Sequence, residues 1–139
     1  MDTCLCLCNS IKSAANTLER QLNAALDGME ISHCQSMVLL ELSGGHATVS
    51  HLSKVLCCSC GNISQIIDLL QKKGVVERVQ STEDRRRAEL TLTPKGKKLS
   101  QQARAALAAK AGDCCAVFSA AEKAELKRLL QKYADATAA

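Results

Sequence analysis

The sequence predicts a mainly α-helical chain with one small two-stranded β-sheet. Residues 88–93 alternate between polar and apolar side chains, and Leu90 and Leu92 fall on one face, which is the period of a half-buried strand. A second short strand is expected at residues 75–79, and most other apolar residues recur at helical spacings of three and four. With 139 residues, 47% of them hydrophobic, residues 1–139 are expected to form a single domain with its own core.

Two helices are expected in the first third of the chain. The first runs from about residue 5 to 26, and its apolar stripe consists of Ile11, Ala14, Ala15, Leu18, Leu22, Ala25 and Leu26. The second begins near Ser32, because serine is a favoured N-cap residue, and it ends before a loop at residues 43–46.

A helix-turn-helix pattern follows these two helices. A short helix is expected at residues 49–56, and a second one from about Cys60 to Lys73 after a tight turn. The second helix has an apolar face made of Ile63, Ile66, Ile67 and Leu70, and Gly74 ends it. Two short helices, a tight turn and a two-stranded wing together form a winged helix-turn-helix.

Two further helices are expected after the wing. Thr93 caps a long helix at residues 94–116, with Pro94 at its first position, and Ser119 and Glu122 have the spacing of a capping box that opens the last helix. The first helix and these two cannot bury their apolar faces on a small winged lobe alone. We therefore expect them to pair with the same helices of a second chain in a symmetric dimer.

Two segments carry a resemblance to a known family. They are LLQKKGVVER at residues 69–78 and the spaced set Asp84, Arg86, Leu90, Leu92, Thr93 and Gly96. On these segments the chain resembles the MarR family of bacterial transcription regulators, and the resemblance extends over nearly its whole length. It implies a homodimer that binds double-stranded operator DNA and acts as a repressor. The dimerisation helices are then expected at about 4–27 and 94–135, and the DNA-binding lobe at about 32–93.

The candidate DNA contacts lie on the second helix of the motif and at the tip of the wing. They are Ser59, Gly61, Asn62, Ser64, Gln65, Arg85, Arg86 and Arg87. Asparagine and glutamine can bond adenine bidentately in the major groove, and arginines at an exposed tip suit the electronegative minor groove. Alternatively, these polar residues are only solvated, and Arg86 braces the wing turn through Asp84.

The distribution of basic residues along the chain supports a DNA-binding site, whereas the net charge does not. The net charge of +4 is modest and does not by itself establish DNA binding. Basic residues are concentrated in the middle third, where the wing arginines are joined by Lys72, Lys73, Arg78, Lys95, Lys97 and Lys98. For the lysines after Pro94, a solvated charged face is as good an interpretation as phosphate contact.

Nine cysteines are many for a chain that is expected to be cytoplasmic. No run approaches the roughly 18 apolar residues that a membrane span needs, and the N-terminus lacks the pattern of a signal peptide, so no membrane is expected as a partner. Cytosolic thiols are kept reduced. The cysteines therefore favour metal binding or redox chemistry over structural disulfides.

The first candidate metal site lies at the expected dimer interface, where the first helix meets the last two. Its ligands are Cys4, Cys6, Cys8, Cys114 and Cys115. Converging thiolates suit a soft ion, namely Cu(I), Zn(II), Cd(II), Hg(II) or As(III). Binding of such an ion is expected to weaken the affinity for DNA by tilting the two lobes.

The other cysteines have separate interpretations. Cys57 and Cys60 lie three residues apart in the turn of the motif and form the second candidate metal site. Cys34 stands alone on its helix and is expected to be a small buried hydrophobic residue. By the family resemblance, Cys58 fills the place of an apolar residue that plugs the turn.

Alternative functions are also consistent with the cysteines. One is a thiol redox switch, with one reactive cysteine and a resolving partner, and another is a simple packing role. A metal-buffering protein without DNA binding is disfavoured by the basic wing. No nucleophile–base pair, phosphate loop or carboxylate pair is present in the sequence, so we do not expect an enzyme.

Overall fold

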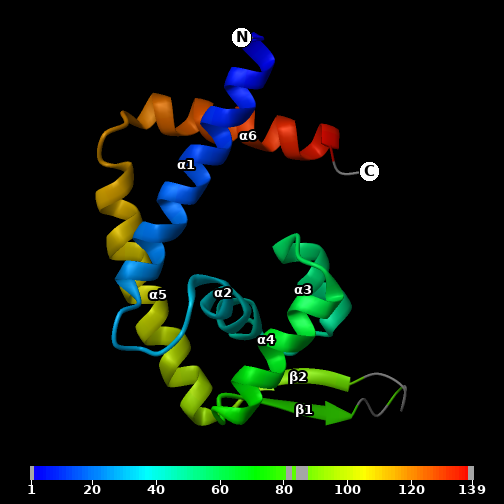
Figure 1. Cartoon of the computed structure of the whole chain (residues 1–139). Coiled ribbons are helices and arrows are strands. Elements are labelled where there is room, and N and C mark those ends of the chain that lie inside the picture. The colour runs from blue at the N-terminus through cyan, green and yellow to red at the C-terminus, as the bar shows by residue number, and fades with distance from the viewer. Residues whose placement is uncertain (1, 81–82, 84–87, 138–139) are drawn as a thin grey trace.

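The computed structural model describes residues 2–80, 83 and 88–137. Along the chain these residues form α1 (Thr3–Ala25), α2 (His33–Leu42), α3 (Val49–Leu56), α4 (Cys60–Lys72), β1 (Val76–Gln80), β2 (Ala88–Leu92), α5 (Pro94–Cys115) and α6 (Ala120–Thr137). Figure 1 shows α3, α4 and the two strands gathered in one lobe, while α6 lies at the opposite end of the molecule. The predicted fold class, mainly α with a two-stranded wing, is confirmed.

The helix starts that local chemistry predicts are also confirmed. The Ser32 hydroxyl accepts a hydrogen bond from the backbone N–H of Gln35, and the Gln35 side chain bonds back to the N–H of Ser32. Ser119 and Glu122 make the same reciprocal pair at α6. Each such cap satisfies backbone donors that the first turn of a helix leaves unpaired.

The two strands form an antiparallel ribbon that is attached to the rest of the lobe. Val76 pairs with Leu92, and Arg78 pairs with Leu90. The predicted first strand, at residues 75–79, is shifted by one residue to Val76–Gln80. Ala47, in the loop before α3, exchanges two backbone hydrogen bonds with Leu90, at N–O distances of 3.2 and 2.7 Å. This bridge fixes the wing against the start of the helix-turn-helix.

One core holds the lobe together. Its fully covered side chains come from α2, α3, α4 and both strands, and include Val38, Leu39, Leu52, Ile63, Ile67, Leu70, Val76 and Leu90. Ala103 and Leu107 from α5 close the same core. The core therefore fixes the orientation of α4 within the lobe, because both covered isoleucines of α4 lie in the core.

Helix α5 begins against the wing at a point where only glycine fits. Thr93 caps α5 through the N–H of Gly96, and its hydroxyl donates to the carbonyl of Gly74 at 2.7 Å. A β-carbon on Gly96 would lie 1.9 Å from the carbonyl oxygen of Val75. Gly96 therefore allows the backbone of α5 to lie directly on the chain that enters β1.

The N- and C-terminal helices are poorly covered within one chain. No residue of α1 or α6 is buried, although α1 lies along α5. Leu18 is 46% exposed, Leu126 is 42% exposed and Leu130 is 46% exposed. Within the described ranges, no helix has the length and apolar character needed to cross a membrane.

Candidate nucleic-acid interface

The recognition helix α4 begins in a tightly specified turn. Cys57 caps the end of α3 in the left-handed region, at φ 54°, where a glycine is favoured. The N–H of Cys58 donates to the carbonyl of Ser53 at 3.1 Å, and the Ser53 hydroxyl donates back to the carbonyl of Cys58. Ser59 then caps α4 by accepting from the N–H of Asn62 at 3.1 Å, as the sequence predicts. This turn fixes where the polar face of α4 begins.

The polar face of α4 is open to solvent. Gly61, Asn62 and Gln65 are exposed, whereas Ser64 is half-buried. Ile63 and Ile67, on the opposite face, have no exposed surface. The helix therefore presents amide side chains outward from a rigid base, which is the arrangement that base reading in the major groove requires.

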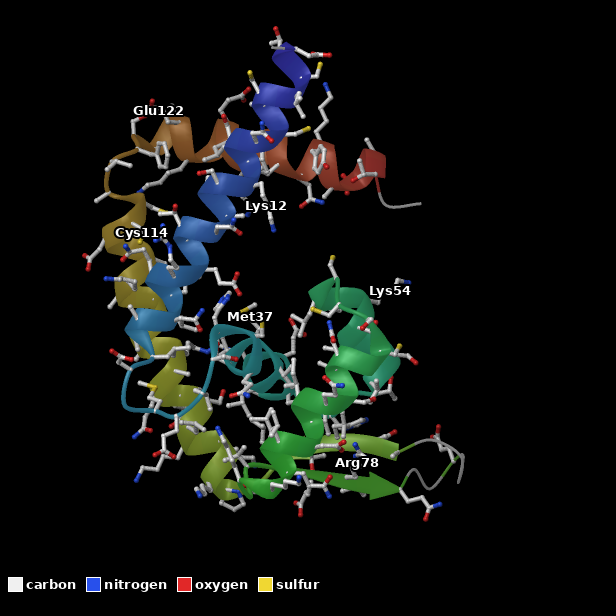
Figure 2. All side chains as sticks on the ribbon, viewed as in Figure 1. Lys12, Met37, Lys54, Arg78, Cys114 and Glu122 are labelled. Carbon is white, nitrogen blue, oxygen red and sulfur yellow. The ribbon has the colours of Figure 1, made fainter. Side chains whose placement is uncertain are left out.

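An ion pair links α4 to the wing, and sequence reasoning missed it. Arg78 on β1, labelled in Figure 2, donates to Asp68 on α4, with 2.8 Å between Nη2 and Oδ1. Both side chains are about half exposed. Arg78 belongs to the predicted basic cluster, but its charge lies beside a carboxylate. No local pattern predicts this pairing, because ten residues and a turn separate the two positions.

Two lysines of the predicted basic cluster donate hydrogen bonds to backbone carbonyls of other segments. Lys73 donates to the carbonyl of Glu30, and Lys95 donates to the carbonyl of Lys73 at 3.1 Å. Lys72, Lys97 and Lys98 are exposed and remain candidates for phosphate contact. The predicted wing residues Asp84, Arg85, Arg86 and Arg87 lie outside the described residues.

The second predicted surface, for dimerisation, is apolar and exposed. A hollow of about 350 Å³ lies at the junction of α5 and α6, and its lining includes Cys115, Phe118, Leu126 and Leu130. Val117, Leu129 and Tyr133 are also more than one-third exposed. An apolar surface of this kind is more typical of an interface than of a free helix.

The cysteines of the first candidate metal site do not converge within one chain. Cys4, Cys6 and Cys8 are exposed and all lie in α1, where Cys4 and Cys8 share a face and Cys6 points away from it. Helix α5 ends with Cys114, which is half-buried and labelled in Figure 2, and with Cys115, which is exposed. In the described part of the chain, no group of three or more His, Cys, Asp or Glu side chains is placed to hold a metal ion.

The cysteines of the turn region differ from one another. Cys57 and Cys60 are exposed, and Cys58 is half-buried and packs against the core, as expected of a plug. The prediction that Cys34 is buried is wrong, because its side chain is exposed. Cys34 lies in the first turn of α2, where its thiol donates to Glu19 of α1 across 3.9 Å from Sγ to Oε1.

The surroundings of Cys34 disfavour its thiolate. Partial burial raises the pKa of the Cys34 thiol most, and the neighbouring Glu19 carboxylate and Cys58 thiol raise it further. The hydrogen bond to Glu19 acts in the same direction. Cys34 is therefore a protonated and weakly nucleophilic thiol at neutral pH.

Comparison with known sequences points to one family. The family model described as the MarR family matches residues 32–88. The multiple antibiotic resistance protein MarR of Salmonella typhimurium is 33% identical over 85 residues, which are 60% of this chain and 59% of that protein. The HTH-type transcriptional regulator PrsX of Escherichia coli is 33% identical over 86 residues, 60% of this chain and 52% of PrsX. The matches therefore span between half and three-fifths of these curated relatives.

Solved structures match over a greater length. A cysteine-to-serine variant of E. coli MarR, in complex with operator DNA, has a TM-score of 0.88 and 27% identity and covers 96% of this chain and 99% of that chain. The organohalide-sensing regulator RdhR, bound to 2,4-dichlorophenol, has a TM-score of 0.90 at 21% identity and covers 99% of this chain and 82% of that chain. At 21% identity, the similarity to RdhR supports only the fold.

Proposed function

We propose that this chain is a regulator of the MarR type, which its residues 32–88 match, and that it is a homodimer that binds a palindromic operator and acts as a repressor. One observation carries the proposal. Helix α4 has a capped N-terminus and an exposed amide face beside the wing, in a chain that matches an operator-bound E. coli MarR over nearly its whole length. The relatives it matches are transcriptional regulators, and we propose no enzymatic activity for this chain.

In this proposal, base reading falls to Asn62 and Gln65. They lie three residues apart on α4, so their side chains project from neighbouring positions on one face. Gly61 and the capped helix start leave room and backbone donors for a phosphate, and Ser59 and Ser64 flank them. The wing arginines, Arg85 to Arg87, supply the cationic tip for the minor groove.

The dimer is proposed from the surface that one chain leaves open. Leu126, Leu129 and Leu130 repeat at helical spacing along α6, which no other element covers extensively. A second copy that presents the same helices would bury this face in an isologous interface. The helices at about 4–27 and 94–135 then hold the dimer, and the lobe at about 32–93 binds DNA.

Control of DNA affinity by a soft ion at the cysteines is the finer part of the proposal. Cys115 lines the apolar hollow of α6, so an α6 interface would bring it near the second chain. Ligands from two chains, Cys4, Cys6 and Cys8 with Cys114 and Cys115, would then complete a site that one chain lacks. A redox switch through the same thiols is the alternative, and sensitivity to peroxide without sensitivity to metals would favour it.

The proposal is tested by selection from a random pool of duplex DNA under reducing conditions. The expected result is enrichment of a palindromic sequence, bound by two chains for each duplex in native mass spectrometry. Binding without any sequence preference, or by a single chain, would overturn the proposal. A scrambled duplex of the same length and composition serves as the control for non-specific binding.

A further inference from the structure

A cavity with two thiols lies between α2 and the helix-turn-helix. It has a volume of about 280 Å³, and the side chains of Cys34 and Met37 from α2 and Cys58 from the turn line it. His33 also lines it, and apolar side chains of α3 and α4 complete the wall. Met37 is labelled on α2 in Figure 2. The cavity therefore gathers two thiols and a thioether that lie in distant parts of the sequence.

The donor set restricts which ion would fit. Thiolates and thioethers select Cu(I) among the biological metals, whereas zinc sites normally use four nitrogen and sulfur ligands. The described residues include no cluster of three or more His, Cys, Asp or Glu that could hold a metal ion. Cu(I) is compatible with that finding, because two thiolates are enough to bind this ion.

We propose that Cys34 and Cys58 bind one Cu(I) ion in the cavity that Met37 also lines, and that this binding controls recognition of DNA. The site is separate from the two suggested by cysteine spacing in the sequence. Its effect on DNA rests on the proposed function, but the binding of Cu(I) does not.

Glu19 places a carboxylate beside the site, because the Cys34 thiol donates to its Oε1 across 3.9 Å. A cation held by Cys34 would lie near that negative charge, which favours its binding. Both sulfurs bind Cu(I) as their S–H protons leave, so two protons are released for each ion and no electron is transferred. Affinity for Cu(I) therefore rises with pH.

The position of Cys58 connects the cavity to the recognition helix. Its backbone is held on both sides by Ser53, and the next residue, Ser59, is the N-cap of α4. An ion that joins Cys58 to Cys34 ties this turn to α2. Since α4 starts from the turn, such a tie changes the orientation of Asn62 and Gln65 relative to the wing. We expect DNA affinity to fall when the ion is bound.

The test isolates the pair from the other thiols. In the full-length chain, Cys4, Cys6, Cys8, Cys57, Cys60, Cys114 and Cys115 are all replaced by serine, and folding is checked by circular dichroism. Cu(I) affinity is then measured anaerobically by competition with a chromophoric Cu(I) chelator. We expect one ion for each chain, and at least about a tenfold loss of affinity when Cys34→Ser or Cys58→Ser is added.

Two results would overturn the proposal. One is an affinity for Cu(I) that neither Cys34→Ser nor Cys58→Ser lowers in this background. The other is binding of less than one Cu(I) ion for each chain at a chelator concentration at which a free dithiol still removes Cu(I) from the chelator. DNA affinity is measured separately, with and without Cu(I). Tight Cu(I) binding by a protein that binds no duplex in any condition would sink the proposed function while leaving the copper site in place.

Discussion

Arg78 on β1 donates a hydrogen bond to Asp68 on α4 across 2.8 Å, and this ion pair joins the wing to the recognition helix. The two elements that are proposed to face DNA are therefore held together by charge as well as by the core. Asp68 also loses part of its repulsion for phosphate because a guanidinium lies beside it. The pair links two surfaces that are proposed to contact DNA.

The Arg78–Asp68 pair is expected to contribute little to the free energy of unfolding. Both side chains are about half exposed, and exposed ion pairs contribute roughly 0.2–1 kcal/mol. A double-mutant cycle with Arg78→Ala and Asp68→Ala, measured by urea unfolding, should give a coupling energy in that range. A coupling above about 2 kcal/mol would show that the bridge is a main support of the lobe.

Replacing Gly96 by alanine is expected to destabilise the protein strongly. The added methyl group would meet the carbonyl oxygen of Val75 at 1.9 Å, so α5 or the chain entering β1 must move. We expect a loss of about 1–3 kcal/mol or more in urea unfolding, as for overpacked cores. Gly112→Ala is the matched control, because it lies in the same helix with nothing within 4 Å of the new methyl group. That control should stabilise by roughly 0.5–1 kcal/mol, and equal effects of the two changes would contradict the account.

Replacing Cys57 by glycine is expected to stabilise the protein. Cys57 adopts φ 54°, a left-handed conformation that costs an L-residue roughly 1–2 kcal/mol. Glycine removes that strain but is more flexible when unfolded, so the expected net gain is about 0.5–1 kcal/mol. Cys57→Ala keeps the strain and removes only the thiol, and should leave thermal stability nearly unchanged. A gain from alanine that matched the gain from glycine would assign the effect to the thiol instead.

Local chemistry determines the parts of the fold that the sequence predicts well. The caps at Ser32, Ser59, Thr93 and Ser119 depend on residues within three positions, and all four are confirmed. The exposure of Cys34 and the pairing of Arg78 with Asp68 depend on how distant elements pack, and no periodicity contains that information. The cavity shared by Cys34, Met37 and Cys58 was missed for the same reason.

Charges on the open face of α6 are expected to separate the dimer. Leu126→Glu combined with Leu130→Glu places two carboxylates where a second copy is proposed to pack, and a desolvated unpaired charge is costly. We expect monomers at micromolar concentration in sedimentation velocity, with helix content retained. Ala124→Glu, two residues before Leu126 and on the opposite face of the helix, should remain dimeric. A dimer that survived the double change would place the interface elsewhere.

The most direct test of the DNA-binding account is the salt dependence of affinity for the selected duplex. Joint replacement of Arg85, Arg86 and Arg87 by alanine should weaken binding across sequences. It should also flatten the slope of log affinity against log salt by roughly 0.9 for each phosphate that the variant no longer neutralises. Arg20, Arg128 and Lys132, which lie on α1 and α6 away from the wing, provide a control that removes the same charge. Because these helices are proposed to hold the dimer, sedimentation velocity first verifies that the control variant is still dimeric. The account predicts a normal slope for the control variant and a flatter one for the wing variant. A folded wing variant with unchanged affinity and unchanged slope would contradict it.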